Sequence, residues 1–220
     1  MARTPRSSRR TRRSPRSLSS AWGAAQPVPT PGDGDSPEPM RLAQTHADAV
    51  TLYGARSYSQ AVRVFGQVYE GCSTALGVDH DATLTVAGNL AVSLIGAGRT
   101  RAGIAFLRRN LADRVRRWGD LDAGTLTARD ALAVALRLNG DVHGAVALST
   151  TVTDQRRQVL GRSHLDTLTS VMGLVRALAA AGERNRAIAV LNENVGQAET
   201  AHGTHHASVR ALVDCGRHLG

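Results

Sequence analysis

The feature that most constrains this chain is an internal repeat with a period of 42 residues. Four independent features recur at this step: two sets of glycines, a Thr-Leu-Thr tripeptide and a small residue. The sets are Gly77, Gly119, Gly161 and Gly203; Gly98, Gly140 and Gly182; 83–85, 125–127 and 167–169; and Ala61, Gly103, Ala145 and Ala187. A fixed period of this size indicates a stack of similar units, each of which buries its apolar side against its neighbours.

Each unit has the pattern of two helices. In the unit 77–118, apolar residues recur at helical spacing over 84–94 and stop at Gly-Ala-Gly, 96–98, where glycine suits the left-handed turn that ends a helix. A second apolar stripe runs over about 99–118. The pattern predicts an all-α fold, a solenoid of antiparallel helix pairs.

The same period predicts the domain organisation. The units are three full repeats flanked by atypical ends, as expected where a stack must end against water. We expect full repeats at 77–118, 119–160 and 161–202, a degenerate repeat at 40–76 and a capping helix at 206–219. Together they form one helical repeat domain, 40–220.

The segment 1–39 has a different composition, rich in Arg, Ser, Pro and Gly and poor in large apolar residues. Such a segment cannot bury enough surface to offset the entropy of ordering, so we expect disorder. Seven Arg and no acid lie in 1–16. Two interpretations remain open: a solvated tail or a start codon assigned too early, and a nucleic-acid tether that acts through counterion release.

Charge and cysteine content exclude several function classes. All 27 basic residues are Arg, so a phosphate-binding loop that requires Lys is impossible. From residue 40 onward there are 20 Arg and 15 acids, a net charge of only +5. Two distant cysteines without a CxxC motif favour a reducing, cytoplasmic setting, and no apolar run reaches the ~18–20 residues of a membrane span. We expect no enzyme activity and no cofactor.

The cluster Asp79-His80-Asp81 could be a metal or acid/base site, or it could cap a helix. It directly precedes the first helix of its unit, and the later units carry diluted copies, one of them without His. Short polar side chains at this place can accept hydrogen bonds from the free N–H groups of the first turn. We therefore predict capping and no metal, and we expect Cys72 and Cys215 to be buried small hydrophobes.

The linkers carry a family resemblance. The stretch 76–84, LGVDHDATL, matches the L-G-x-D-H-P-x-T-L linker of kinesin-light-chain-type tetratricopeptide repeats, except that Asp81 replaces proline. The stretch 160–168 matches nearly as well, and 118–122 is a degenerate copy without His. The chain thus resembles a bacterial member of this 42-residue repeat family. The resemblance implies a right-handed superhelix in which the first helix of each pair lines a concave groove.

The resemblance also implies candidate groove residues, namely positions of the first helices that lie off the core stripe. Asn89 lies where related arrays use Asn to hold a peptide backbone, and Arg137 and Arg176 could pair with carboxylates. Ordinary solvated faces are the alternative interpretation. The candidates are Thr85, Asn89, Thr127, Asp130, Arg137, Thr169 and Arg176.

One second helix also carries a basic stripe, for which a solvated convex face and a contact with an acidic partner or phosphate backbone both remain open. Its residues are Arg108, Arg109, Arg114, Arg116 and Arg117. As a function we expect a non-enzymatic scaffold or adaptor that binds a peptide or protein segment in its groove, in bacterial signalling or regulation. The alternative is a nucleic-acid-associated factor tethered through the Arg-rich tail. We expect no membrane partner.

Overall fold

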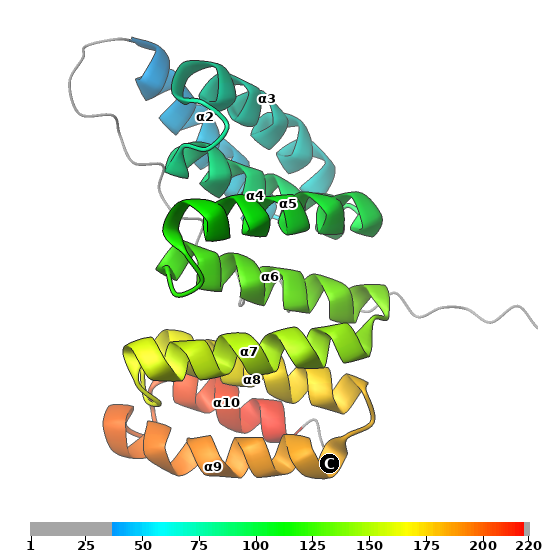
Figure 1. The fold of residues 1–220 in the computed structure, drawn as a ribbon, viewed down its shortest axis with the longest axis vertical. Coiled ribbons are helices and arrows are strands. Elements are labelled where there is room, and N and C mark those ends of the chain that lie inside the picture. The colour runs from blue at the N-terminus through cyan, green and yellow to red at the C-terminus, as the bar shows by residue number, and fades with distance from the viewer. Residues whose placement is uncertain (1–36, 218–220) are drawn as a thin grey trace, which may run out of the picture.

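The computed structural model describes residues 37–217, and the side chains of 41–217. The described residues form helices joined by short turns and contain no strand. Successive helices pair antiparallel and the pairs stack along the long axis of the molecule (Figure 1). The helices are α2 Pro37–Gly54, α3 Tyr58–Leu76, α4 Asp81–Gly96, α5 Thr100–Trp118, α6 Ala123–Asn139, α7 Val142–Leu160, α8 Leu165–Ala180, α9 Arg184–His202 and α10 Ala207–Arg217.

This architecture confirms the predicted all-α solenoid of antiparallel helix pairs. The first helix begins at Pro37, so that residues 37–39 of the predicted tail are helical, and the rest of that tail lies outside the described residues. The predicted capping helix at 206–219 corresponds to α10, and its last two positions also lie outside the described residues.

The polar linker residues cap the first helices, as predicted. The Nδ1 atoms of His80 and His164 accept hydrogen bonds from the N–H groups of Ala82 and Asp166, each at 3.2 Å. The Nδ1 atom of His206 accepts from the N–H of Ser208 in the same way. The Asp-His-Asp cluster is thus a helix cap, because its histidine satisfies an otherwise unpaired donor of the first helical turn.

The periodic glycines occupy backbone conformations that other residues avoid. The glycines that follow the second helices have φ between 78° and 92° with ψ between 152° and 177°, a region that is essentially restricted to glycine. The glycines between the two helices of a pair also have positive φ, 80° to 92°. The two glycine phases of the sequence therefore mark the two turns of each repeat.

The small residues of the second helices mark the closest approach between paired helices. Ala61, Ala145 and Ala187 are fully buried. At Gly103 an added Cβ would lie 2.5 Å from the Ile95 side chain and 2.7 Å from a backbone carbonyl of the first helix. Only a small residue fits at this phase, so its recurrence in the sequence reflects helix packing rather than chemistry.

The first helices lie on one side of the stack. Helix α4 packs on α6, α6 on α8, and α8 on α10, more extensively than successive second helices pack on one another. We call the surface of α4, α6, α8 and α10 the inner face, and that of α3, α5, α7 and α9 the outer face. Within the described part of the chain, no helix is both long and apolar enough to cross a membrane.

Candidate functional site

The seven predicted groove residues lie on α4, α6 and α8, and they divide into two groups by exposure. Three of them are buried: Thr85, Asn89 and Asp130. The other four are half-buried: Thr127, Arg137, Thr169 and Arg176. The accessible candidates thus belong to α6 and α8, and the α4 residues serve internal contacts.

Asn89 joins the inner face of α4 to α2. Its Nδ2 atom lies 3.0 Å from Nε2 of His46, whose ring meets Phe65 edge-on at 5.6 Å between ring centroids. Burial lowers the pKa of His46, so the imidazole is neutral and its Nε2 can accept from the amide. Because Asn89 supports a buried histidine, Asn89→Ala would disturb packing as well as any binding.

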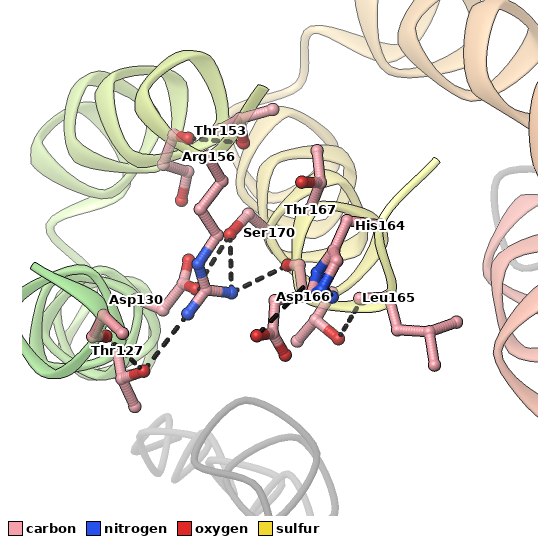
Figure 2. Close-up of polar contacts among 12 residues, drawn as sticks. Thr127, Asp130, Thr153, Arg156, His164, Leu165, Asp166, Thr167 and Ser170 are labelled. Atoms are coloured by element: carbon pink, nitrogen blue, oxygen red, sulfur yellow. Dashed lines mark hydrogen bonds and ion pairs between the residues drawn. The ribbon is translucent and has the colours of Figure 1, made fainter. Parts of the chain in front are cut away.

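Asp130 is the centre of a buried network that connects three helices. Its Oδ2 atom lies 2.8 Å from Nη1 of Arg156 on α7 and accepts a 2.8 Å hydrogen bond from the Ser170 hydroxyl on α8. The same Arg156 guanidinium donates to the Asp166 carbonyl and to Thr127 Oγ1. Figure 2 shows the guanidinium lying between α6 and α8.

Burial determines the electrostatics of this network. It raises the pKa of Asp130 from 3.8 to about 6, although Arg156 and the Ser170 hydroxyl both favour the charged form. Asp166 adds a smaller repulsion that raises the pKa further. Asp130 is therefore a structural carboxylate rather than a groove contact, and the charge it offers to a partner is already neutralised by Arg156.

Arg114 takes the same role one repeat earlier. It lies one period before Arg156, is 5% exposed, and donates to Asp81 and Thr85, which lie on α4. Its Nη2 bond to Thr85 matches the bond from Arg156 to Thr127. The assignment of Arg114 to an exposed basic stripe was wrong, because its side chain is buried among these helix contacts. The 42-residue spacing of the two arginines is the signal that could have identified the pair.

The degenerate linker of the second full repeat uses different residues for the same purpose. Asp122 replaces the capping histidine and accepts from the N–H of Thr125 at 2.8 Å. Asp120 pairs with the buried Arg129 at 2.5 Å, and Arg129 also donates to Gln155 on α7. The linker without His therefore still caps the following helix, but it does so through other residues, and Arg129 connects it to α7.

Arg137 and Arg176 come together at the far end of the inner face. Burial raises the pKa of the Cys215 thiol on α10, while Arg176, which is hydrogen-bonded to it, and Arg137 both lower it. The pKa of this one thiol therefore responds to a guanidinium from α6 and to another from α8. No carboxylate among the described residues forms an ion pair with Arg176 at 4.0 Å or less.

These two arginines are not required by the repeat itself. The residues equivalent to Arg176 in the two preceding repeats are Val92 and Val134, both buried. The residues equivalent to Arg137 in the neighbouring repeats are Ile95 and Ala179. Positive charge at these positions is thus specific to α6 and α8, and it makes this end of the inner face suited to a carboxylate.

The remaining candidates form no reactive site in the part of the chain that the structure describes. Cys72 and Cys215 are free and buried there. The rings of His202 and His206 are in tilted contact, with centroids 5.3 Å apart, but each already has a backbone partner. The described residues include no group of three or more His, Cys, Asp or Glu that could hold a metal ion.

Comparison with known proteins agrees with the repeat and the fold. Residues 125–166 match the family model of a tetratricopeptide repeat, and no curated protein matches the chain. A solved structure of a variant of nearly identical TPR-like repeats, described as those of a kinesin light chain of Podosopora anserina, superposes with a TM-score of 0.73 at 23% identity. The match covers 85% of this chain and 87% of the other.

A second structure of such repeats from the same organism has a TM-score of 0.66 at 22% identity. That match covers 84% of this chain and 97% of the other. The likeness establishes the fold, and it extends over nearly the whole length of both relatives.

Proposed function

We propose that this chain, whose residues 125–166 match a tetratricopeptide repeat and whose fold resembles that of solved kinesin-light-chain-type repeats, is a non-enzymatic scaffold whose inner face binds a segment of another protein. The partner segment lies across α6 and α8 and carries a carboxylate that pairs with Arg176. We further propose a cytoplasmic role in bacterial signalling or regulation, in which the array recruits a partner and any nucleotide-driven step belongs to another protein.

The observation that carries this proposal is the half-buried Arg176. Its guanidinium faces a neutral thiol and has no carboxylate partner among the described residues, whereas the equivalent residues are valines. A half-buried charge without a carboxylate partner is unfavourable for the isolated fold. A carboxylate of a partner protein would therefore form a charge-assisted, bidentate interaction with Arg176, with little competition from water. Thr127 and Thr169, also half-buried, lie on the same two helices.

The test uses a substitution that the repeat itself supplies. Arg176→Val places in α8 the residue that α4 and α6 carry at the same phase, so the fold is retained. Partners are first identified by affinity purification from the source cells, and the dissociation constant of the purified pair is then measured by calorimetry. We expect about tenfold weaker binding for Arg176→Val, since charged hydrogen bonds contribute ~1.5–3 kcal/mol, and unchanged binding for the outer-face control Arg184→Val. Equal binding by both variants would refute the assignment.

A second candidate function rests on the sequence of residues 1–16, with seven Arg and no acid. Such a segment would bind nucleic acid through counterion release, with strong salt dependence. Deleting residues 1–36 should then weaken binding and lower the slope of its salt dependence. A shortened chain that binds as tightly as the full-length protein at 150 mM salt would reject the tail as the nucleic-acid tether.

A further inference from the structure

The outer face of α5 carries a row of arginines. The row consists of four arginines. The second, third and fourth lie seven, eight and fifteen positions after the first, a spacing that places all four on one side of the helix. They are Arg101, Arg108, Arg109 and Arg116. All four are exposed, Arg109 with 74% and Arg116 with 65% of the side-chain surface accessible. At 1.5 Å per residue the row is about 22 Å long.

Nearby acids neutralise this row only in part. Asp113 lies 3.8 Å from Arg109 and 3.1 Å from Arg116, which also reaches Asp79 at 3.2 Å. Arg101 and Arg108 form no ion pair with any residue that the structure describes. Asp113 and Asp79 therefore fix the side chains at the C-terminal end of the row, and the row keeps a net positive charge.

The other repeats show that the row is not a requirement of the fold. At the same four phases, the second helices α3, α7 and α9 carry no basic residue other than one histidine. Their residues are Ser59, Gly66, Gln67 and Thr74; His143, Thr150, Thr151 and Gln158; and Asn185, Asn192, Glu193 and Thr200. Small or polar side chains are thus sufficient for a solvated outer face, so the arginines of α5 are not needed for solubility.

The composition of this surface distinguishes between kinds of anionic partner. Between the arginines lie the exposed Ala105 and Ala112, while Ile104 and Leu107 are buried against neighbouring helices. Flat protein interfaces are commonly centred on large anchoring side chains, and helices that lie in a membrane surface insert apolar residues. Nucleic-acid backbone binding needs neither, because arginine–phosphate contacts supply the affinity.

We propose that Arg101, Arg108, Arg109 and Arg116 on α5 form a binding surface for the phosphate backbone of nucleic acid. The surface is separate from the inner face and from the residue 1–16 segment. Its length corresponds to about two-thirds of a turn of duplex DNA, which advances ~34 Å per turn. Binding at such a surface is independent of base sequence, since only phosphates are contacted.

The experiment compares three full-length proteins, so that residues 1–36 are present in all of them. The first is the wild type, the second carries Arg101→Gln and Arg108→Gln, and the third carries Arg184→Gln and Arg210→Gln. The two variants lose the same charge, and all four substituted arginines are exposed and form no ion pair with the described residues. Binding to a fluorescent 20-base-pair duplex is measured by anisotropy over a range of salt concentrations.

We expect the α5 variant to bind the duplex roughly tenfold more weakly at 50 mM salt and to lose about two units from the slope of log K against log salt, because each phosphate contact contributes about 0.9. The Arg184/Arg210 variant should match the wild type. Equal losses in both variants, or no duplex binding by the wild type, would overturn the proposal. It would also fail if poly-glutamate or phosphatidylserine vesicles displaced the duplex from the wild type at matched charge concentration.

Discussion

Asp130 on α6 and Arg156 on α7 form a buried ion pair, with Oδ2 and Nη1 2.8 Å apart and each side chain no more than 6% exposed. Among the full repeats the pair occurs once. One period later the same two positions carry Met172 and Ala198. These two positions of the repeat can therefore hold either a buried ion pair or two apolar residues. The later repeat shows which apolar residues could replace the pair.

The first prediction concerns the energetics of this pair. Arg156→Ala alone leaves a buried carboxylate without its partner, and we expect a loss of about 3–5 kcal/mol in the free energy of unfolding. The double variant Asp130→Met with Arg156→Ala copies the next repeat and should recover most of that loss. Urea denaturation of the single and double variants checks this. A double variant as unstable as the sum of the two single variants would show that the pair is not a replaceable unit.

The second prediction follows from the raised pKa of Asp130. The folded state binds this proton more tightly than the unfolded state does, because the pKa is about 6 when folded and 3.8 otherwise. The contribution to stability is therefore largest below pH ~4 and is lost as the pH rises through about 6. The difference in unfolding free energy between the wild type and Asp130→Asn should fall between pH 4 and pH 7. A difference that rises over this range would contradict the assignment.

The third prediction has the opposite sign and concerns His46. Burial lowers its pKa, so the unfolded state binds the proton more readily. The stability that neutral His46 provides is present above about pH 6.5 and is lost as the pH falls below that value. We expect the advantage of the wild type over His46→Gln to shrink from pH 7 to pH 5, measured by thermal unfolding. An advantage that is constant with pH would mean that His46 does not titrate with folding.

The fourth prediction separates the two glycine phases. Gly161 has φ 86° and ψ 164°, a conformation in which a Cβ is strained, whereas Gly140 has φ 92° and ψ −1°, in the left-handed region that Asn tolerates. Gly161→Ala should lower the free energy of unfolding by about 1–3 kcal/mol. Gly140→Asn should cost less than half as much. Equal costs in a side-by-side chemical denaturation would indicate that the two turns impose the same constraint.

Much of the fold could be predicted from the sequence because the repeat expresses one packing rule several times. Gly161 recurs with its equivalents because the backbone there has a positive φ, whereas Gly103 has alanines as equivalents because the paired helices lie too close for a larger residue. His80 and its equivalents His164 and His206 precede a helix because each caps its first turn. Side-chain partners were harder to predict. Arg114 looked like one member of an exposed stripe because a helix can direct an arginine either way, and only the positions of the neighbouring helices decide the direction.

The candidate site was predicted less completely, for a similar reason. Positions off the core stripe of α4 were expected to face a partner, yet Thr85 and Asn89 are buried in contacts with neighbouring helices. Spacing within one helix cannot show how closely the preceding repeat approaches. Arg176 is half-buried on α8, and its contact with a partner stays a prediction.

The most direct test of the scaffold proposal is site-specific photo-crosslinking in the source cells. A photoreactive residue replaces Thr169 on the inner face in one full-length protein and Thr151 on the outer face in another, and crosslinked products are identified by mass spectrometry. We predict that one partner crosslinks through position 169, that it is absent at position 151, and that adding Arg176→Val to the first protein removes it. Products that form equally from both faces, or that persist at position 169 with Arg176→Val, would contradict binding at the inner face.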